Sequence, residues 1–501
     1  MAHAPKVTDE QQQSEIRDDR TRMAATRGKG PTTMKYPTIS RRGFLAATAS
    51  AGLLWTPVIA GCGALPVQRA RSSKARNVIF LVADGMNTGT WSIADYYMQH
   101  LGQGQSEWVK LYQQQAVTRS LMETCSADSR VTDSAAAASA WSTGIRINNG
   151  AINISTDGTV LAPIHEKVQR SGRSTGLVTT TRVTHATPAA FAANVVSRGE
   201  EDTIASQYLD RGVDVLLGGG EKHFSAATRA DHADLKLAYQ NAGYQLLESR
   251  DQLLNSVEGA SRRLLGLFWP SHLPYTIDRD ANPDIASQVP TLQEMMRRAL
   301  STLERNRDGF LLQVEGGRVD HGGHANDVGA IVHDQIAFDE CIAVARAYCQ
   351  ENPDTLVIVT TDHGCGGCQL NGVGAGYKNT DATFFPGIDA IGASYEHLQS
   401  ALPSMEQEAY AALVEQRLQI VIDEKRYQQL QVEHAKGGYA VANLIKKWHG
   451  SFARTGVNWT SGNHTGEFVE LCAWGPGSDS VEPWLPNTDL HDVIEQALGL
   501  S

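Results

Sequence analysis

The chain has 501 residues, enough to bury a large hydrophobic core without covalent cross-links, and its formal net charge is −11. No block of Lys and Arg interrupts this acidic balance, so a positively charged groove for nucleic acid is not expected. An acidic protein still binds small anions where metal ions supply local positive charge.

Residues 1–61 are predicted to be a leader that is not part of the folded domain. The polar residues 1–39 end at Ser40-Arg41-Arg42-Gly43-Phe44-Leu45, and a mildly apolar run follows from Ala46 to Gly61. Paired arginines before such a run are typical of a twin-arginine export signal. The run is too short and too rich in Ala, Thr and Ser to predict a membrane span. We expect export to the periplasm or the cell surface; the alternative is a chance arginine pair.

The apolar run ends in Ile59-Ala60-Gly61-Cys62, which resembles the cleavage box of a bacterial lipoprotein. Cys62 would then carry lipid, begin the mature chain and tether it to a membrane. Simple cleavage nearby, with a free Cys62, is the alternative. The leader is unusually long, and a start at Met34 instead of Met1 would shorten it. Residues 62–76 are read as a linker.

From Asn77 onward the pattern changes to alternating strands and helices. Asn77–Ala83 is a continuous apolar run rich in β-branched residues, which predicts a strand buried on both faces. Comparable runs lie at 174–180, 213–217, 309–314 and 355–361, and helical patterns such as 291–306 lie between them. We predict an α/β fold over residues 77–500, with a central, mostly parallel sheet flanked by helices on both faces.

Residues 380–455 differ from the rest of this region. They are rich in Gln, Glu, Ala and Leu, and they carry few strand signals. Arg417–Glu433 is predicted to be a helix. We interpret 380–455 as an inserted, mostly helical subdomain and not as a second catalytic unit.

Six cysteines remain once Cys62 is set aside, and an exported protein could join them in disulfides. We expect at most one or two, because proteins that use the twin-arginine route cross the membrane already folded. Cys365-Gly-Gly-Cys368 resembles half of a zinc knuckle, but no second Cys-x-x-Cys follows it. We keep two alternatives for this pair: a short-loop disulfide, or two unpaired thiols.

Acidic residues and a histidine follow several predicted strands directly. Asp84, Glu315 and the pair Asp362-His363 each stand just past a strand. In parallel sheets, sites form at the carboxyl ends of strands. We therefore expect these side chains to share one site.

The residue types around these strand ends suit metal ions. Asp320 and His324 are four residues apart, so a helix would place both on one face, where they could grip one zinc ion. Oxygen ligands suit magnesium, and His combined with Asp suits zinc. Two zinc ions would clamp the attacking and leaving oxygens of a phosphoryl transfer. Ser134, in a run of small residues, is the candidate nucleophile, and coordination to zinc would activate it.

Six segments carry the residues with chemical function. In chain order they are Asp84-Gly85-Met86, Val131–Ala136, Thr184–Pro188, Glu315–His324, Thr360–His363 and Gly462–Gly466. Together they resemble the alkaline phosphatase family, and the likeness extends over nearly all of residues 77–480. It includes intervening stretches such as Asp214–Gly220, Leu264–Phe268 and Pro274-Tyr275.

The resemblance implies a role for each matching position. Ser134 would be the nucleophile, phosphorylated during turnover, and Arg198 would grip the phosphate with its planar fork. The implied ligands of two zinc ions and one magnesium ion are Asp320, His324 and His464 for the first zinc; Asp84, Asp362 and His363 for the second zinc; and Asp84, Thr187 and Glu315 for magnesium.

Three positions vary within the family. His185 and His321 stand where some bacterial members have Asp and Lys, and Asn194 stands where His is common. We interpret all three as neighbours that tune the site without binding an ion. The histidines leave open whether the third site takes magnesium or zinc. The resemblance also implies a homodimer that acts on small phosphate monoesters.

Three other functions are weighed against this interpretation. A phosphodiesterase of the same superfamily would usually lack the magnesium ligands, whereas Thr187 and Glu315 are both present. A sulfatase needs Cys or Ser followed by x-Pro-x-Arg, which Ser134–Ala138 lacks. A non-catalytic lipoprotein that binds metal or phosphate would have no need of a placed nucleophile.

Overall fold

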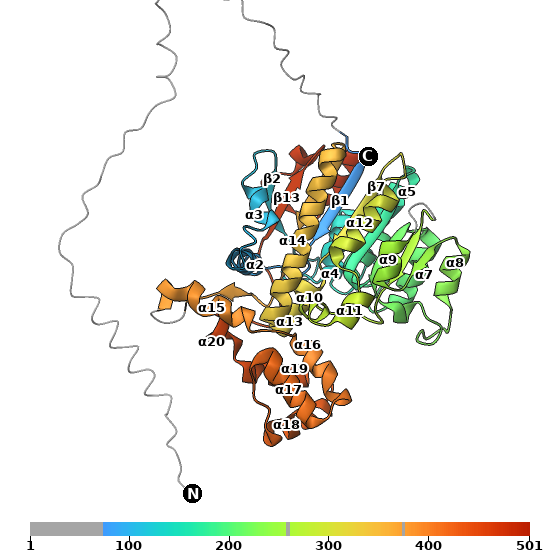
Figure 1. Cartoon of the computed structure of the whole chain (residues 1–501). Coiled ribbons are helices and arrows are strands. Elements are labelled where there is room, and N and C mark those ends of the chain that lie inside the picture. The colour runs from blue at the N-terminus through green and yellow to red at the C-terminus, as the bar shows by residue number, and fades with distance from the viewer. Residues whose placement is uncertain (1–73, 257–260, 373–375, 501) are drawn as a thin grey trace, which may run out of the picture. The chain divides into compact units, whose positions relative to one another are not determined.

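The computed structural model describes residues 74–256, 261–372 and 376–500, so the expected export signal and Cys62 lie outside the described residues. The described chain is built around a ten-stranded sheet (Figure 1). The strands lie in the order β14 (Trp484–Pro486), β2 (Thr118–Glu123), β13 (Val469–Trp474), β8 (Thr355–Thr360), β1 (Asn77–Val82), β7 (Phe310–Glu315), β3 (Ser174–Arg182), β4 (Val215–Gly219), β6 (Leu264–Leu267) and β5 (Gln245–Leu247).

The sheet is mostly parallel, as predicted. Within it, β13 alone runs antiparallel to its neighbours β2 and β8. The five strands expected from continuous apolar runs are β1, β3, β4, β7 and β8. Strand β2 was not predicted, because its side chains alternate between buried and exposed positions and so form no continuous apolar run.

Two hydrophobic cores lie on opposite faces of the sheet because side chains alternate along each strand. In β1, Ile79 and Leu81 point into one core, whereas Val78 and Phe80 point into the other. Helices therefore cover both faces, as predicted. The first core contains residues of α2 (Thr88–His100), α3 (Glu107–Tyr112), α10 (Thr276–Asp280), α12 (Leu292–Leu303) and α14 (Val328–Glu351). The second contains residues of α4 (Ser134–Thr143), α5 (Ile164–Arg170), α6 (Ala186–Ala192), α7 (Glu201–Arg211), α8 (Leu235–Asn241) and α21 (Asp489–Leu498).

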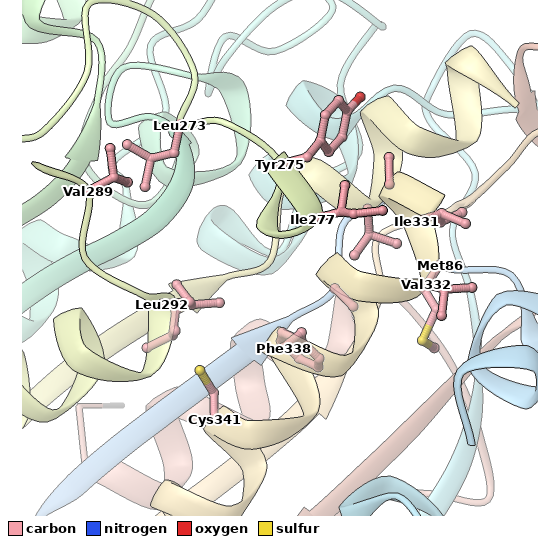
Figure 2. Close-up of a cluster of buried hydrophobic side chains, with 14 of the residues drawn as sticks. Met86, Leu273, Tyr275, Ile277, Val289, Leu292, Ile331, Val332, Phe338 and Cys341 are labelled. Atoms are coloured by element: carbon pink, nitrogen blue, oxygen red, sulfur yellow. The ribbon is translucent and has the colours of Figure 1, made fainter. Parts of the chain in front are cut away.

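Figure 2 shows part of the first core, where Phe338 and Cys341 of α14 lie close to β1 and Leu292 of α12 packs beside them. Helix α12 confirms the helical pattern expected over 291–306. It begins with a capping box, in which Thr291 and Glu294 each bond the other's backbone N–H. Three further helices are α9 (Arg250–Asn255), α11 (Pro283–Gln288) and α13 (Arg318–Ala325), and α9 and α13 add Leu253 and Val319 to the first core.

Residues 380–455 are helical, as expected. Their helices are α15 (Thr380–Asp389), α16 (Tyr395–Ala401), α17 (Gln407–Leu418), α18 (Glu424–His434), α19 (Ala440–His449) and α20 (Ser451–Thr455). The prediction of one helix over Arg417–Glu433 was wrong. Helix α17 ends where Gln419 adopts the left-handed conformation with φ 56°, and the Asp423 side chain caps the start of α18. Ile420 and Ile422, between the two helices, are buried.

Two buried carboxylates hold the start of α16 against the rest of the fold. Asp278 accepts hydrogen bonds from the backbone N–H and the hydroxyl of Ser394, at 2.8 and 2.6 Å. Asp327, which caps α14, accepts the N–H of Tyr395 at 2.7 Å. The inserted helices are therefore anchored directly beside α13, which carries predicted metal ligands.

Two further observations bear on the expectations from the sequence. All six cysteines in the described part of the chain are free thiols. None of the helices in that same part is both long and apolar enough to cross a membrane.

Candidate active site

The carboxyl ends of three adjacent strands meet at one edge of the sheet. β1 lies between β7 and β8 and runs parallel to both. Asp84 follows β1, Glu315 is the last residue of β7, and Asp362 follows β8. All three carboxylates are fully buried. The structure therefore brings together the strand-end residues that the sequence analysis expected to share a site.

One group of ligand atoms combines Asp84, Asp362 and His363, whose atoms lie within 4.8 Å of one another. His363 Nε2 is 3.1 Å from Asp362 Oδ2 and 3.7 Å from Asp84 Oδ1. Ser134 Oγ lies 3.3 Å from the same His363 nitrogen. The predicted nucleophile is thus next to the predicted ligands of the second zinc ion.

A second group forms around α13, where Asp320 and His324 lie on one helical face, as expected. His324 Nδ1 is 2.7 Å from the carbonyl of Gly462, and His464 Nδ1 is 2.8 Å from the carbonyl of Thr132. A carbonyl only accepts, so each Nδ1 carries a proton, and Nε2 is the atom of each ring that would bind an ion. The two Nε2 atoms are 3.0 Å apart. Burial lowers the pKa of His324, but Asp320 outweighs it and raises that pKa to about 9, so without an ion the His324 Nε2 holds a proton that a metal would displace.

A third group contains Asp84, His185 and Glu315. Thr187 Oγ1 lies 3.3 Å from Asp84 Oδ2, which adds a hydroxyl oxygen beside this group. His185, expected only to tune the site, has a ring nitrogen close enough to share an ion with the two carboxylates. Its nitrogen among oxygen ligands suits zinc as well as magnesium.

Two threonines that the sequence analysis did not single out hold Glu315 in place. Thr179 Oγ1 donates a short hydrogen bond to Glu315 Oε2, and Thr181 Oγ1 lies 3.2 Å from the same oxygen. Both threonines are buried near the end of β3. In the sequence, the only signal for this role was that both threonines lie at the end of an expected strand. Strand ends rich in threonine are common, so that signal is weak.

The donor set fits cations because buried negative charge converges without compensating donors. Asp84 Oδ1, Glu315 Oε1, Asp320 Oδ1 and Asp362 Oδ2 are buried and accept no hydrogen bond. Burial, and then the neighbouring carboxylates Asp362, Asp320 and Glu315, raise the pKa of Asp84 well above its usual value. Burial raises the pKa of Glu315 to about 7. Divalent ions would remove this conflict.

Ser134 is the first residue of α4, and its neighbours are small. Asp133 caps the helix by accepting the Ala136 N–H at 2.9 Å. The free N–H groups and partial positive charge of a helix N-terminus favour an anion beside Ser134. The aspartate before the alanine-rich run could have been recognised as a cap from the sequence.

Arg198 is held beside this helix by both ends of its guanidinium group. Nη1 lies 3.0 Å from Asp133 Oδ2, and Nη2 lies 3.1 Å from His185 Nε2. The two contacts fix the planar fork of Arg198 near the cap of α4. That placement is consistent with its predicted contact with phosphate.

His321 lies near His185, with ring centroids 5.6 Å apart. Arg318 donates to His321 Nδ1 at 2.7 Å, so the ring proton resides on Nε2. Burial and Arg318 hold the pKa of His321 well below its usual range, so it is a neutral donor. Asn194 does not share this setting: its amide bonds the backbone of Asn153 and Leu161.

A pocket of about 320 Å³ adjoins the group around α13. It is walled partly by the core of the fold and partly by the inserted helices. Its lining residues are Tyr275, His321, His324, Ala325, Glu396, Tyr439, Ala442, Asn443 and Gly462. The pocket gives a substrate room beside the potential metal ligands.

Known proteins share this fold and sequence over most of the chain. The family model for alkaline phosphatase matches residues 75–500. Alkaline phosphatase 3 of Bacillus subtilis is 31% identical over 445 residues, which cover 86% of this chain and 90% of that protein. The crystal structure of Thermus thermophilus alkaline phosphatase is 33% identical with a TM-score of 0.78, and the match covers 89% of this chain and 96% of that one. The cold-active alkaline phosphatase from Shewanella sp. is 30% identical with a TM-score of 0.70, over 85% and 99%.

The parallel sheet, the buried Ser134 beside clusters of potential metal ligands and these similarities define a hydrolase of phosphate monoesters. The chain belongs to the alkaline phosphatase family. The likeness noted in the sequence is thereby confirmed.

Proposed function

We propose that the protein hydrolyses phosphate monoesters through a phosphoserine at Ser134, in a site for two zinc ions and one magnesium ion. The proposal depends on the position of Ser134 Oγ, which lies 3.3 Å from His363 Nε2. The buried carboxylates of the site each have one oxygen that accepts no hydrogen bond. A merely structural serine would not need such surroundings.

The three groups of ligand atoms support three separate ion sites. Asp320, His324 and His464 would hold the first zinc, and Asp84, Asp362 and His363 would hold the second. Asp84, Glu315 and Thr187 would hold magnesium, with His185 as a further ligand that would also accept zinc there. When bound, the zinc ions would supply Lewis-acid stabilisation of the attacking and leaving oxygens.

The chain's own residues would bind, orient and attack the substrate. Arg198 would pair its two terminal nitrogens with two phosphate oxygens, which is the geometry that a guanidinium fork favours. Ser134 Oγ would give its proton to water and bond to phosphorus as the bond between phosphorus and the alcohol oxygen breaks, and the departing oxygen would take up a proton from water. A water molecule would then attack the phosphoserine from the vacated side, which releases phosphate and restores Ser134. The N-terminus of α4 would stabilise the negative charge throughout.

The pocket beside His324 would receive the alcohol part of the substrate. It lies next to the first zinc group and contains the aromatic side chains of Tyr275 and Tyr439. A monoester with an aromatic or other apolar group would bury that group against them.

Export from the cytoplasm, a membrane tether and a dimeric state are also proposed. Arg41-Arg42 would direct the protein through the twin-arginine route to the periplasm or cell surface, and a lipid on Cys62 would tether it to the membrane. A homodimer is proposed by analogy with the family alone.

The test compares monoester and diester hydrolysis by the protein loaded with zinc and magnesium. We expect monoesters to be strongly preferred and chelation to abolish turnover. Ser134→Ala should lower turnover by orders of magnitude while zinc remains bound. Ser142→Ala is the matched control, because Ser142 lies in the same helix and its hydroxyl bonds only the Ile164 N–H. Full activity of Ser134→Ala, or a preference for diesters, would contradict the proposal.

A further inference from the structure

A buried thiol stands among the ligand atoms of the first zinc group. Cys365 Sγ lies within 4.8 Å of the ligand atoms of Asp320, His324 and His464. In the sequence, this cysteine is recognisable only as part of a Cys-x-x-Cys loop. Its neighbours in space are instead the predicted ligands of one ion.

The backbone fixes this placement from two sides. Cys365 lies in β9 (Gly364–Cys365), which pairs with β12 (His464–Thr465), and Cys365 is directly opposite His464. Helix α13 approaches from the other side with Gly323, where an added Cβ would come within 3.0 Å of Cys365 Sγ. The helix that carries Asp320 and His324 thus leaves space for this sulfur atom.

The setting of Cys365 differs from that of an inert buried cysteine. Cys368, three residues along, is part of the hydrophobic core, where thiols behave as small apolar groups. Cys365 is equally buried but belongs to neither hydrophobic core. It faces the carboxylate of Asp320 and the imidazole rings of His324 and His464.

We propose that Cys365 is a fourth protein ligand of the first metal site, which then presents one oxygen, two nitrogens and one sulfur to a single ion. This rests on the proposed function only in taking Asp320, His324 and His464 as ligands of one ion. With these four donors in place, the zinc would take a substrate oxygen as a fifth ligand, an expansion that catalytic zinc sites allow. The thiol releases its proton to solvent as the sulfur–metal bond forms. A sulfur ligand makes the site favour zinc or cadmium over magnesium.

The test is the absorption spectrum of the full-length, metal-free protein titrated with cobalt(II). A thiolate bound to cobalt gives an intense charge-transfer band in the near ultraviolet, whereas oxygen and nitrogen ligands do not. We expect this band in the unaltered protein and in Cys368→Ser, the matched control. Cys365→Ser should lack it, and should bind zinc at this site more than about 10-fold more weakly in competition with a chromogenic chelator.

Two results would overturn the inference. One is a cobalt-loaded, unaltered protein with no thiolate band, which also decides the question if the variant does not fold. The other is a band of full strength in Cys365→Ser or, if that variant is unstable, in Cys365→Ala. A loss of zinc affinity without any thiolate band would show that Cys365 only positions Asp320. Monoester hydrolysis by the zinc-loaded protein, measured in parallel, separates these outcomes from a failure of the proposed function.

Discussion

Replacing Thr179 with valine should weaken the binding of the third ion, at Asp84, His185 and Glu315, by about 10- to 100-fold. Valine keeps the shape of threonine but removes the hydroxyl that donates to Glu315 Oε2. Such a bond to a charged group contributes about 1.5–3 kcal/mol, or roughly 10- to 150-fold in affinity. The bond that remains, from Thr181 Oγ1 at 3.2 Å, compensates only in part.

Losing this donor also changes the competition with protons. The Thr179 hydrogen bond lowers the pKa of Glu315, against the larger effect of burial. Without it, the Glu315 carboxylate holds a proton more tightly, and the ion must displace that proton. The weakening should therefore be larger at pH 7 than at pH 9.

The assay is a magnesium titration of monoester hydrolysis, with the zinc sites already filled. Thr302→Val is the matched control, because Thr302 is a buried threonine whose hydroxyl bonds only the Arg298 carbonyl within α12. The half-saturating magnesium concentration should rise in Thr179→Val and stay constant in the control. An unchanged value in Thr179→Val would refute the role given to this hydroxyl.

Two further predictions concern stability, both measured by urea unfolding. Asp133→Ala should lower the free energy of unfolding by about 2–3 kcal/mol. The change removes the acceptor of the Ala136 N–H at the start of α4, the acceptor of the Gly150 N–H and a partly exposed ion pair with Arg198. A loss below about 1 kcal/mol would contradict this prediction. Burial raises the pKa of Asp334 in the folded protein to about 7. The folded state therefore holds this proton more tightly than the unfolded state, and the stability that results is present at acid pH and is lost as pH rises through 7. In Asp334→Asn the amide oxygen still accepts the Thr276 N–H, and the amide N–H donates to the Thr276 hydroxyl oxygen in place of the second bond. The metal-free variant should therefore gain on the order of 4 kcal/mol over the unaltered protein between pH 4 and pH 8. A stability difference that does not change with pH would rule this out.

The strands and ligands that could be predicted from the sequence share one physical property. β1, β7 and β8 are buried on both faces, so they are continuous apolar runs, and the polar residues after them stand out. Asp320 and His324 could be paired because helical spacing alone places them on one face. The apolar runs, the polar residues that follow them and the four-residue spacing are each visible within a short stretch of sequence.

The features that could not be predicted depend on contacts between distant segments. Thr179 meets Glu315 across 136 residues, and Cys365 meets His464 through a two-residue strand pair that no periodicity reveals. The break at Gln419 was missed because one left-handed residue leaves the polar, helix-favouring composition around it unchanged.

The most direct test of the central claim is to trap the enzyme during turnover and find the phosphoryl group. The protein, loaded with zinc and magnesium, would be mixed with a phosphate monoester, quenched in acid and digested for mass spectrometry. The account predicts one phosphoryl group on the peptide that contains Ser134, and none in the Ser134→Ala variant. A phosphoryl group on any other residue, or rapid turnover by the variant, would contradict it.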